Sequence, residues 1–285
     1  EIVDDHTVDI LTKFPDGLLL NRLAGFILIA PPRYLKDKGD AALERNPIGT
    51  GPFRFEAWEK GRRIVMSANP DYWMKGYPKT SGLVFRFIPA EDQFAALKAG
   101  EIDLLTELPG ARTTEAIQTG LIDIVKRPSF YTVTASLNAT SGPLADVRVR
   151  QALNYAVDKQ QLIRYDLLGN GRILATMTME KEEGHNAALK PFSYDPKKAR
   201  RLLRDAGLLE GFKLKVAVKK QGERAAGILA DQLKRVGVDL QLQVFTDAEL
   251  SQVLATERWD MFLAGCPDPM AHSFFIQSIF LFKAK

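Results

Sequence analysis

The stretch NPIGTGPFRFEAWEKGRRIVMSANPDYW, residues 46–73, decides how the first part of the chain folds. Gly51 and Pro52 predict a tight turn near its start, because glycine has a free backbone and proline a fixed φ. Apolar and polar residues then alternate over residues 53–58, which is typical of a half-buried β-strand. A turn at Gly61 and renewed alternation beyond it predict a second strand. The stretch therefore predicts a β-hairpin that leads into an aromatic loop.

Two further stretches predict helices. Residues 146–169, DVRVRQALNYAVDKQQLIRYDLLG, begin with Asp146, which is a good N-cap. The apolar residues that follow have the spacing of one helix face: Val149, Ala152, Leu153, Ala156 and Val157. Residues 194–208, YDPKKARRLLRDAGL, predict a helix that Asp195 caps and Gly207 ends.

Strands and helices alternate in the last third of the chain. Apolar residues recur with a period of two over residues 212–218, 238–244 and 259–264, and helical patterns separate these segments. This order predicts right-handed crossovers and a sheet that is at least partly parallel. Residues 130–138 alternate in the same way and predict one more strand.

The sequences of these stretches resemble those of one known protein family. NPxGTGPFxFxxW, then ANPDYW, then DVRVRQALxYAxDK are similar to phrases of family 5 of the bacterial extracellular solute-binding proteins. Members of that family deliver peptides, nickel chelates and other solutes to ABC importers. The first two lie in one stretch, residues 46–73, so the chain has two long matches in the same order, which is specific, whereas the glycines alone would be a weak signal.

The resemblance implies an α/β, two-lobed fold of the periplasmic-binding-protein type (class II), with mixed sheets flanked by helices. Residues 1–136 would form part of the first lobe and residues 137–285 the second lobe. It also implies that the chain is a fragment, with more of the first lobe before residue 1 and a final return after the last residue. The lobes would close on a solute by a hinge, and ABC transporter permease subunits would recognise the closed form.

The same resemblance sets expectations for location and chemistry. We expect a monomer in the periplasm or at the extracytoplasmic face of the cell membrane, which touches the membrane only through the transporter. No catalysis and no cofactor are expected.

Two further elements are expected in the first part of the chain. A small βαβ step would consist of residues 83–88, a helix that ends at Gly100 and residues 102–105. A buried strand would form at residues 26–30.

Composition excludes several other classes. The chain has 285 residues, 46% hydrophobic and 26% charged, which is ordinary for a globular protein. Its longest apolar run, residues 26–32, is too short to span a bilayer. The formal net charge is +4, but acidic residues are interspersed with the basic ones. Nucleic-acid binding is therefore not expected, since it favours a basic stripe with interleaved aromatic residues.

A ligand is expected at the end of the last predicted strand, because open α/β sheets bind ligands at the carboxyl ends of their strands. By the resemblance, peptide-binding relatives carry an aspartate there that pairs with the ammonium group of the solute, and Gly265 occupies that position here. Cys266 and Asp268 follow, and Asp268 could substitute for the aspartate. Without a carboxylate, a buried ammonium group is costly.

Two polar residues at the other predicted edge of the cleft complete the candidate site. The resemblance places Ser136 and Asn138 where a strand crosses between the lobes. Their side chains could contact solute or only satisfy strand ends. Peptide-binding relatives can also use an arginine to clamp a carboxylate, and this chain offers only Lys219 and Lys220 in that loop. A dipeptide, a larger peptide and a non-peptide solute therefore all stay open.

The sequence leaves two alternative functions and gives no sign of a metal site. Cys266 with Asp268 and His272 would suggest a hydrolase, but flanking prolines favour a turn. A ligand-sensing domain of a regulator could share the fold, since a fold does not determine function. The three histidines, His6, His185 and His272, do not have metal-ligand spacing.

Overall fold

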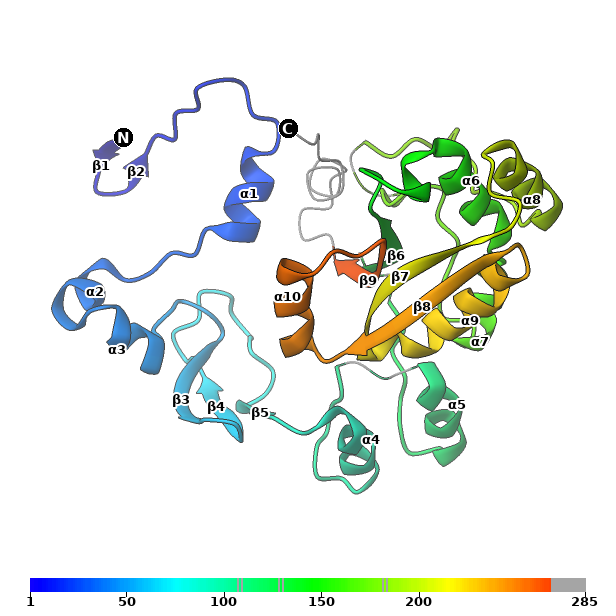
Figure 1. Ribbon diagram of the computed structural model, residues 1–285. Coiled ribbons are helices and arrows are strands. Elements are labelled where there is room, and N and C mark those ends of the chain that lie inside the picture. The colour runs from blue at the N-terminus through cyan, green and yellow to red at the C-terminus, as the bar shows by residue number, and fades with distance from the viewer. Residues whose placement is uncertain are drawn as a thin grey trace. The chain divides into compact units, whose positions relative to one another are not determined.

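The computed structural model describes residues 1–106, 108, 110–127, 129, 131–180, 182 and 184–267 (Figure 1). The chain divides into two compact units, residues 1–108 with 115–123 and residues 109–114 with 124–285. The predicted lobe boundary at residue 136 stays a prediction. The strand that contains this boundary, residues 131–137, belongs wholly to the second unit.

The first unit is built on the predicted hairpin, which is confirmed. Strand β3 (Phe53–Glu59) pairs antiparallel with β4 (Arg63–Ala68), and β4 pairs antiparallel with β5 (Gly82–Arg86). The turn between β3 and β4 contains Gly61, whose φ of 71° suits glycine. A bulge between Phe55 and Ala57 interrupts the strict alternation of β3.

Polar contacts tie the motif residues of this hairpin together. The Arg54 Nε donates to Asn69 Oδ1 at 2.9 Å, and an Arg54 Nη donates to Asp71 Oδ2 at 2.5 Å. The buried Asn69 amide also donates to the Gly51 carbonyl at 2.9 Å. The Gly-Pro turn before β3 and the loop after β4 are therefore fastened to one another.

Short helices make up most of the rest of the first unit. The elements are β1 (Ile2–Asp4), β2 (Thr7–Val8), α1 (Leu19–Phe26), α2 (Pro32–Lys38), α3 (Asp40–Arg45) and α4 (Ala90–Lys98). Helix α5 (Gly110–Thr119) is shared between the two units.

Two strands predicted in the first unit are wrong. Helix α1 continues to Phe26, and the residues after it form no strand, with Leu28 and Ile29 at 93% and 96% exposed. Residues 102–105 also form no strand, so the predicted βαβ step is absent. The side chain of Arg86 on β5 donates to the Glu101 carbonyl at 2.7 Å. Short apolar runs alone do not supply a neighbouring strand.

The second unit contains a four-stranded mixed sheet, in the order β6-β9-β7-β8. Strands β7 (Phe212–Lys219), β8 (Val238–Phe245) and β9 (Met261–Pro267) are parallel, as predicted, and β6 (Tyr131–Leu137) pairs antiparallel with β9 at the edge. The 3₁₀ turn η2 (Lys220–Gly222) and helix α9 (Glu223–Lys234) connect β7 to β8, and α10 (Asp247–Thr256) connects β8 to β9.

The single helix predicted from Asp146 to Gly169 is two helices. Helix α6 (Val147–Ala156) ends where Val157 takes an extended backbone, and Asp158 then caps α7 (Lys159–Tyr165) through two backbone N–H groups. The Oε1 of Gln232 on α9 accepts a hydrogen bond from the Asp158 N–H at 2.8 Å. A residue distant in sequence thus satisfies the backbone at the break. Helix α8 (Pro196–Asp205) begins at its predicted Asp195 cap.

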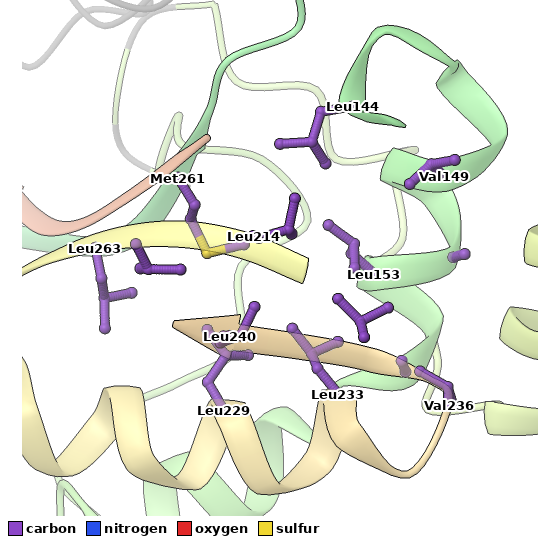
Figure 2. Close-up of a cluster of buried hydrophobic side chains, with 14 of the residues drawn as sticks. Leu144, Val149, Leu153, Leu214, Leu229, Leu233, Val236, Leu240, Met261 and Leu263 are labelled. Carbon is purple, nitrogen blue, oxygen red and sulfur yellow. The ribbon is translucent and has the colours of Figure 1, made fainter. Parts of the chain in front are cut away.

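The main core lies between one face of this sheet and helices α6, α8 and α9. Figure 2 shows leucines of α9 beneath the strands and residues of α6 beside them. Its fully buried large members are Leu144, Leu214, Leu233, Val149, Val216, Val218 and Val238. Helix α10 covers the opposite face, where Leu250 packs with Ala217 and Trp259. Both faces of β7 are therefore buried, as expected for a central parallel strand.

Candidate functional site

The register of β6 against β9 places the predicted site residues at two ends of this strand pair. Ser136 lies opposite Phe262, and the Asn138 N–H donates to the Asp260 carbonyl at 2.9 Å, so both lie at the amino end of β9. Gly265 lies opposite Val133, near the carboxyl end of β9. Three residue steps separate these positions, roughly 10 Å along the strand. The two groups of predicted residues are therefore not brought together on β9.

Asn138 uses its side chain to close the end of β6. Its Nδ2 donates to the Trp259 carbonyl at 3.3 Å, and its Oδ1 accepts from the Thr140 N–H at 3.2 Å and from the Thr140 hydroxyl at 2.6 Å. These contacts match the alternative in which a polar residue satisfies a strand end. A solute contact by Asn138 stays a prediction.

Ser136 belongs to a row of hydroxyl side chains along one face of β6. Residues 132, 134 and 136 alternate on that face, and Ser136 is half-buried. The Thr132 and Thr134 hydroxyl oxygens are buried and have no hydrogen-bond partner within the described part of the chain. Sequence reasoning did not single out these two threonines, although their alternation with Tyr131 and Val133 was visible.

Gly265 lies directly beneath an aromatic ring. A Cβ atom at this position would overlap the Oη and Cζ atoms of Tyr131. The register explains the contact, because Tyr131 is two residues before Val133, the residue opposite Gly265, and diagonal neighbours across strands lie within reach of aromatic side chains. Tyr131 is the residue that sequence reasoning missed. The contact depends on the register of β6 against β9, which the sequence alone does not show.

The remaining predicted residues are only partly described. Cys266 lies opposite Thr132 in the register of β9. Asp268 and His272 lie outside the described residues. The ligand-binding roles of Gly265, Cys266 and Asp268 therefore stay predictions, as does that of Ser136.

The basic residues after β7 stand at the carboxyl end of the same sheet. The loop is a short 3₁₀ turn that leads directly into α9. Lys220 Nζ pairs with Glu223 at 2.5 Å, and both side chains are well exposed. An exposed pair of this kind contributes little stability, and this contact agrees with a lysine at the surface.

Perturbed titratable groups of the second unit lie at helix ends. The Arg148 side chain, through a hydrogen bond, lowers the pKa of Asp146, the cap of α6. Burial lowers the pKa of Lys159 at the start of α7 and raises that of Asp166 at its end. These shifts follow from helix capping and packing, and none marks a proton-transfer pair.

The described ranges contain neither a metal-ion cluster nor a membrane-spanning helix. No three His, Cys, Asp or Glu residues there are grouped to hold a metal ion. No helix there has both the length and the apolar character needed to cross a membrane.

The α/β architecture, with its mixed four-stranded sheet, is that of a solute-binding protein fold. DppA of Helicobacter pylori, solved with the peptide STSA, superposes with a TM-score of 0.78 at 27% identity, over 95% of this chain and 55% of that one. HbpA2 of Haemophilus parasuis gives a TM-score of 0.74 at 27% identity, over 95% and 56%. The fold class predicted from the sequence is confirmed.

The family follows from a direct match. The model of bacterial extracellular solute-binding proteins, family 5 Middle, matches residues 1–283, and the chain belongs to this family. The glutathione-binding protein GsiB of Pectobacterium atrosepticum is 32% identical over 85% of this chain and 48% of its own length. The dipeptide-binding protein of Escherichia coli is 34% identical over 74% of this chain and 41% of its own. The chain thus spans about half the length of the curated relatives it matches.

Proposed function

We propose that the protein is an extracytoplasmic solute-binding protein that delivers a short peptide or another small solute to an ABC importer. The observation that carries this proposal is the family match over residues 1–283. Relatives named for glutathione and for dipeptides support a peptide-like solute. Binding would close two lobes about a hinge, and the closed form would dock on the permease subunits. The periplasm or the outer face of the cell membrane is the proposed location.

Binding without catalysis is part of the same proposal. Solute-binding proteins need differential affinity for two conformations, and a ligand shifts the population only by that difference. If the protein were a hydrolase, it would turn over a substrate, and Cys266→Ala would abolish that turnover. If it were a regulator, the complete gene would encode a helix-turn-helix segment. A protein that serves an importer requires an export signal instead.

The proposal is tested with the full-length mature protein by thermal shift. One set of samples contains a pool of short peptides, and separate sets contain opines, sugars and metal chelates. A ligand at 100 times its Kd adds about 2.7 kcal/mol of stability, which a melting experiment resolves. A shift in the peptide pool supports a peptide solute, and a shift in another pool alone moves the proposal to that solute class. No shift in any pool contradicts the importer role.

A further inference from the structure

The ring of Tyr131 occupies the space that a side chain at position 265 would fill. The overlap of a Cβ at position 265 with the phenol oxygen and Cζ means that the end of the ring lies over the backbone of β9. Only glycine leaves room for this arrangement. The glycine therefore makes room for the ring, and the ring covers a backbone that has no side chain of its own.

Most of the Tyr131 side chain nevertheless stays exposed. Tyr131 is 56% exposed, and Val133, which projects from the same face of β6, is 53% exposed. The next residues of that face on β9 towards its amino end, Leu263 and Met261, are buried in the core. The apolar face of the β6–β9 pair thus continues from the core to the surface, and Tyr131 is its outermost member on β6.

The position of this ring matters because of the direction of the strands. Tyr131 lies opposite Pro267, the last residue of β9, and β7, β8 and β9 run parallel. Ligands of open α/β sheets bind outside the carboxyl ends of the parallel strands. Pockets for small ligands are lined mainly by apolar and aromatic side chains with a few polar groups. A tyrosine supplies both, through its ring and its hydroxyl.

We propose that Tyr131 is a specificity-determining residue, whose ring, in the space left free at Gly265, packs against an apolar side chain of the bound solute. The inference rests on the proposed solute-binding function and narrows it to solutes with an apolar group at this position. Gly265 then acts as a positioning residue, because any side chain there displaces the ring.

The test compares variants of the full-length protein by isothermal titration calorimetry. The probes are alanyl-phenylalanine, alanyl-leucine, alanyl-glycine and glutathione. Tyr131→Val removes the ring but keeps a good strand former, and Tyr131→Phe keeps the ring. Tyr165→Ala is the matched control, because Tyr165 is a comparably exposed tyrosine on α7. Melting temperatures of all variants show whether each one folds.

The expected result is a selective loss. Tyr131→Val weakens binding of the two dipeptides with large apolar side chains by about tenfold, and weakens alanyl-glycine much less. Tyr131→Phe and Tyr165→Ala stay within about threefold of the wild type. Gly265→Ala reproduces the loss of Tyr131→Val, and the double variant adds little to either single change.

Two outcomes overturn the inference and leave the proposed function standing. In one, the folded Tyr131→Val variant binds every probe as the wild type does. In the other, it weakens all probes equally, which indicates a structural role for the ring. If the wild-type protein binds none of the probes and no pool in the thermal-shift screen, the inference fails together with the function on which it rests.

Discussion

The two units of this chain differ in what holds their sheets together. In the second unit, large side chains such as Leu214 and Leu233 are fully buried between the sheet and its helices. In the first unit, the three-stranded sheet exposes Val84 and Phe85 on β5, and polar bonds from Arg54 fasten its ends. A strong sequence motif can therefore mark a set of polar bonds that fastens a sheet, and not only a hydrophobic core. Substitutions in matched pairs, one in each unit, test this difference.

The largest effect is expected from core truncation. Leu214→Ala leaves a cavity at a position with no exposure and should lower the free energy of unfolding by about 2–5 kcal/mol. Val84→Ala on β5 removes an apolar side chain that is 56% exposed and should cost less than about 1 kcal/mol. Urea unfolding of both variants measures the difference. Equal losses would mean that the first sheet depends on burial as much as the second.

A second pair separates backbone strain from steric overlap. Gly211 has a φ of 81°, and a Cβ there would overlap the Gly237 carbonyl oxygen. Gly61 in the hairpin has a φ of 71°, and a Cβ there would meet no atom within 4 Å. Gly61→Ala should therefore cost about 1 kcal/mol, from strain alone, and Gly211→Ala more than about 2 kcal/mol. Similar melting temperatures for the two variants would contradict this account.

A third pair concerns side-chain amides that bond to the backbone. Gln232 is buried, and its amide bonds to both the N–H and the carbonyl of Asp158. Gln232→Ala should cost about 1–3 kcal/mol, because it removes a buried side chain and leaves two backbone groups of Asp158 without their partner. Gln93 in the first unit makes a half-buried bond to the Ile88 carbonyl, and Gln93→Ala should cost about 0.5–1 kcal/mol.

Hydrogen exchange provides a local readout for the third pair. The Asp158 amide should lose protection in Gln232→Ala, because the break between α6 and α7 opens there first. In the Gln93→Ala variant the same amide should keep its protection. An unchanged Asp158 amide in the Gln232→Ala variant would show that another group satisfies the break.

The smallest effect is a pH dependence. The Arg148 side chain lowers the pKa of Asp146 from its ordinary 3.8, and the Arg63 side chain lowers that of Glu59 from 4.5. A carboxylate whose pKa is lower in the folded state stabilises the fold above its unfolded value, and this contribution disappears as pH falls through the folded value. Asp146→Asn and Glu59→Gln should therefore each flatten the loss of stability below about pH 4–5.

Salt and the choice of substitution sharpen this last comparison. Both carboxylates are at the surface, so added salt should reduce the loss of stability at acid pH in the wild type. Salt should change this loss much less in the two variants, because each of them lacks one of the charges. Asparagine also caps helices well, so Asp146→Asn removes the charge while keeping the start of α6. Melting temperatures between pH 3 and pH 7 check the prediction, and a steeper acid slope in either variant would contradict it.

Local features of the fold could be predicted from the sequence because neighbouring residues produce them. Asp195 and Pro196 begin α8 as expected, and Gly61 turns the hairpin, since caps and turns depend on residues within a few positions. The parallel strands of the second unit also followed from alternation and order. Strands predicted at residues 26–30 and 102–105 failed, since an apolar run specifies burial but not a hydrogen-bonding partner.

For the candidate site, too, the sequence predicted individual residues but not the contacts between distant ones. The resemblance singled out Gly265, but the ring above it comes from Tyr131, more than a hundred residues earlier. Asn138 was recognised as a polar residue at a strand end, and only the structure shows that its amide bonds to Trp259. Ser136 and Gly265 were predicted at two edges of one site, and only the structure shows that three residue steps along β9 separate them.

The sequence by itself determined the family, the hairpin, the helix caps and the parallel part of the sheet, because each depends on residue type and spacing along the chain. Only the tertiary structure decided the break at Asp158, the antiparallel register of β6 and the placement of Tyr131 over Gly265. The physical reason is that these features depend on contacts between residues far apart in sequence, where backbone hydrogen bonds and the space left by a missing Cβ determine which groups meet.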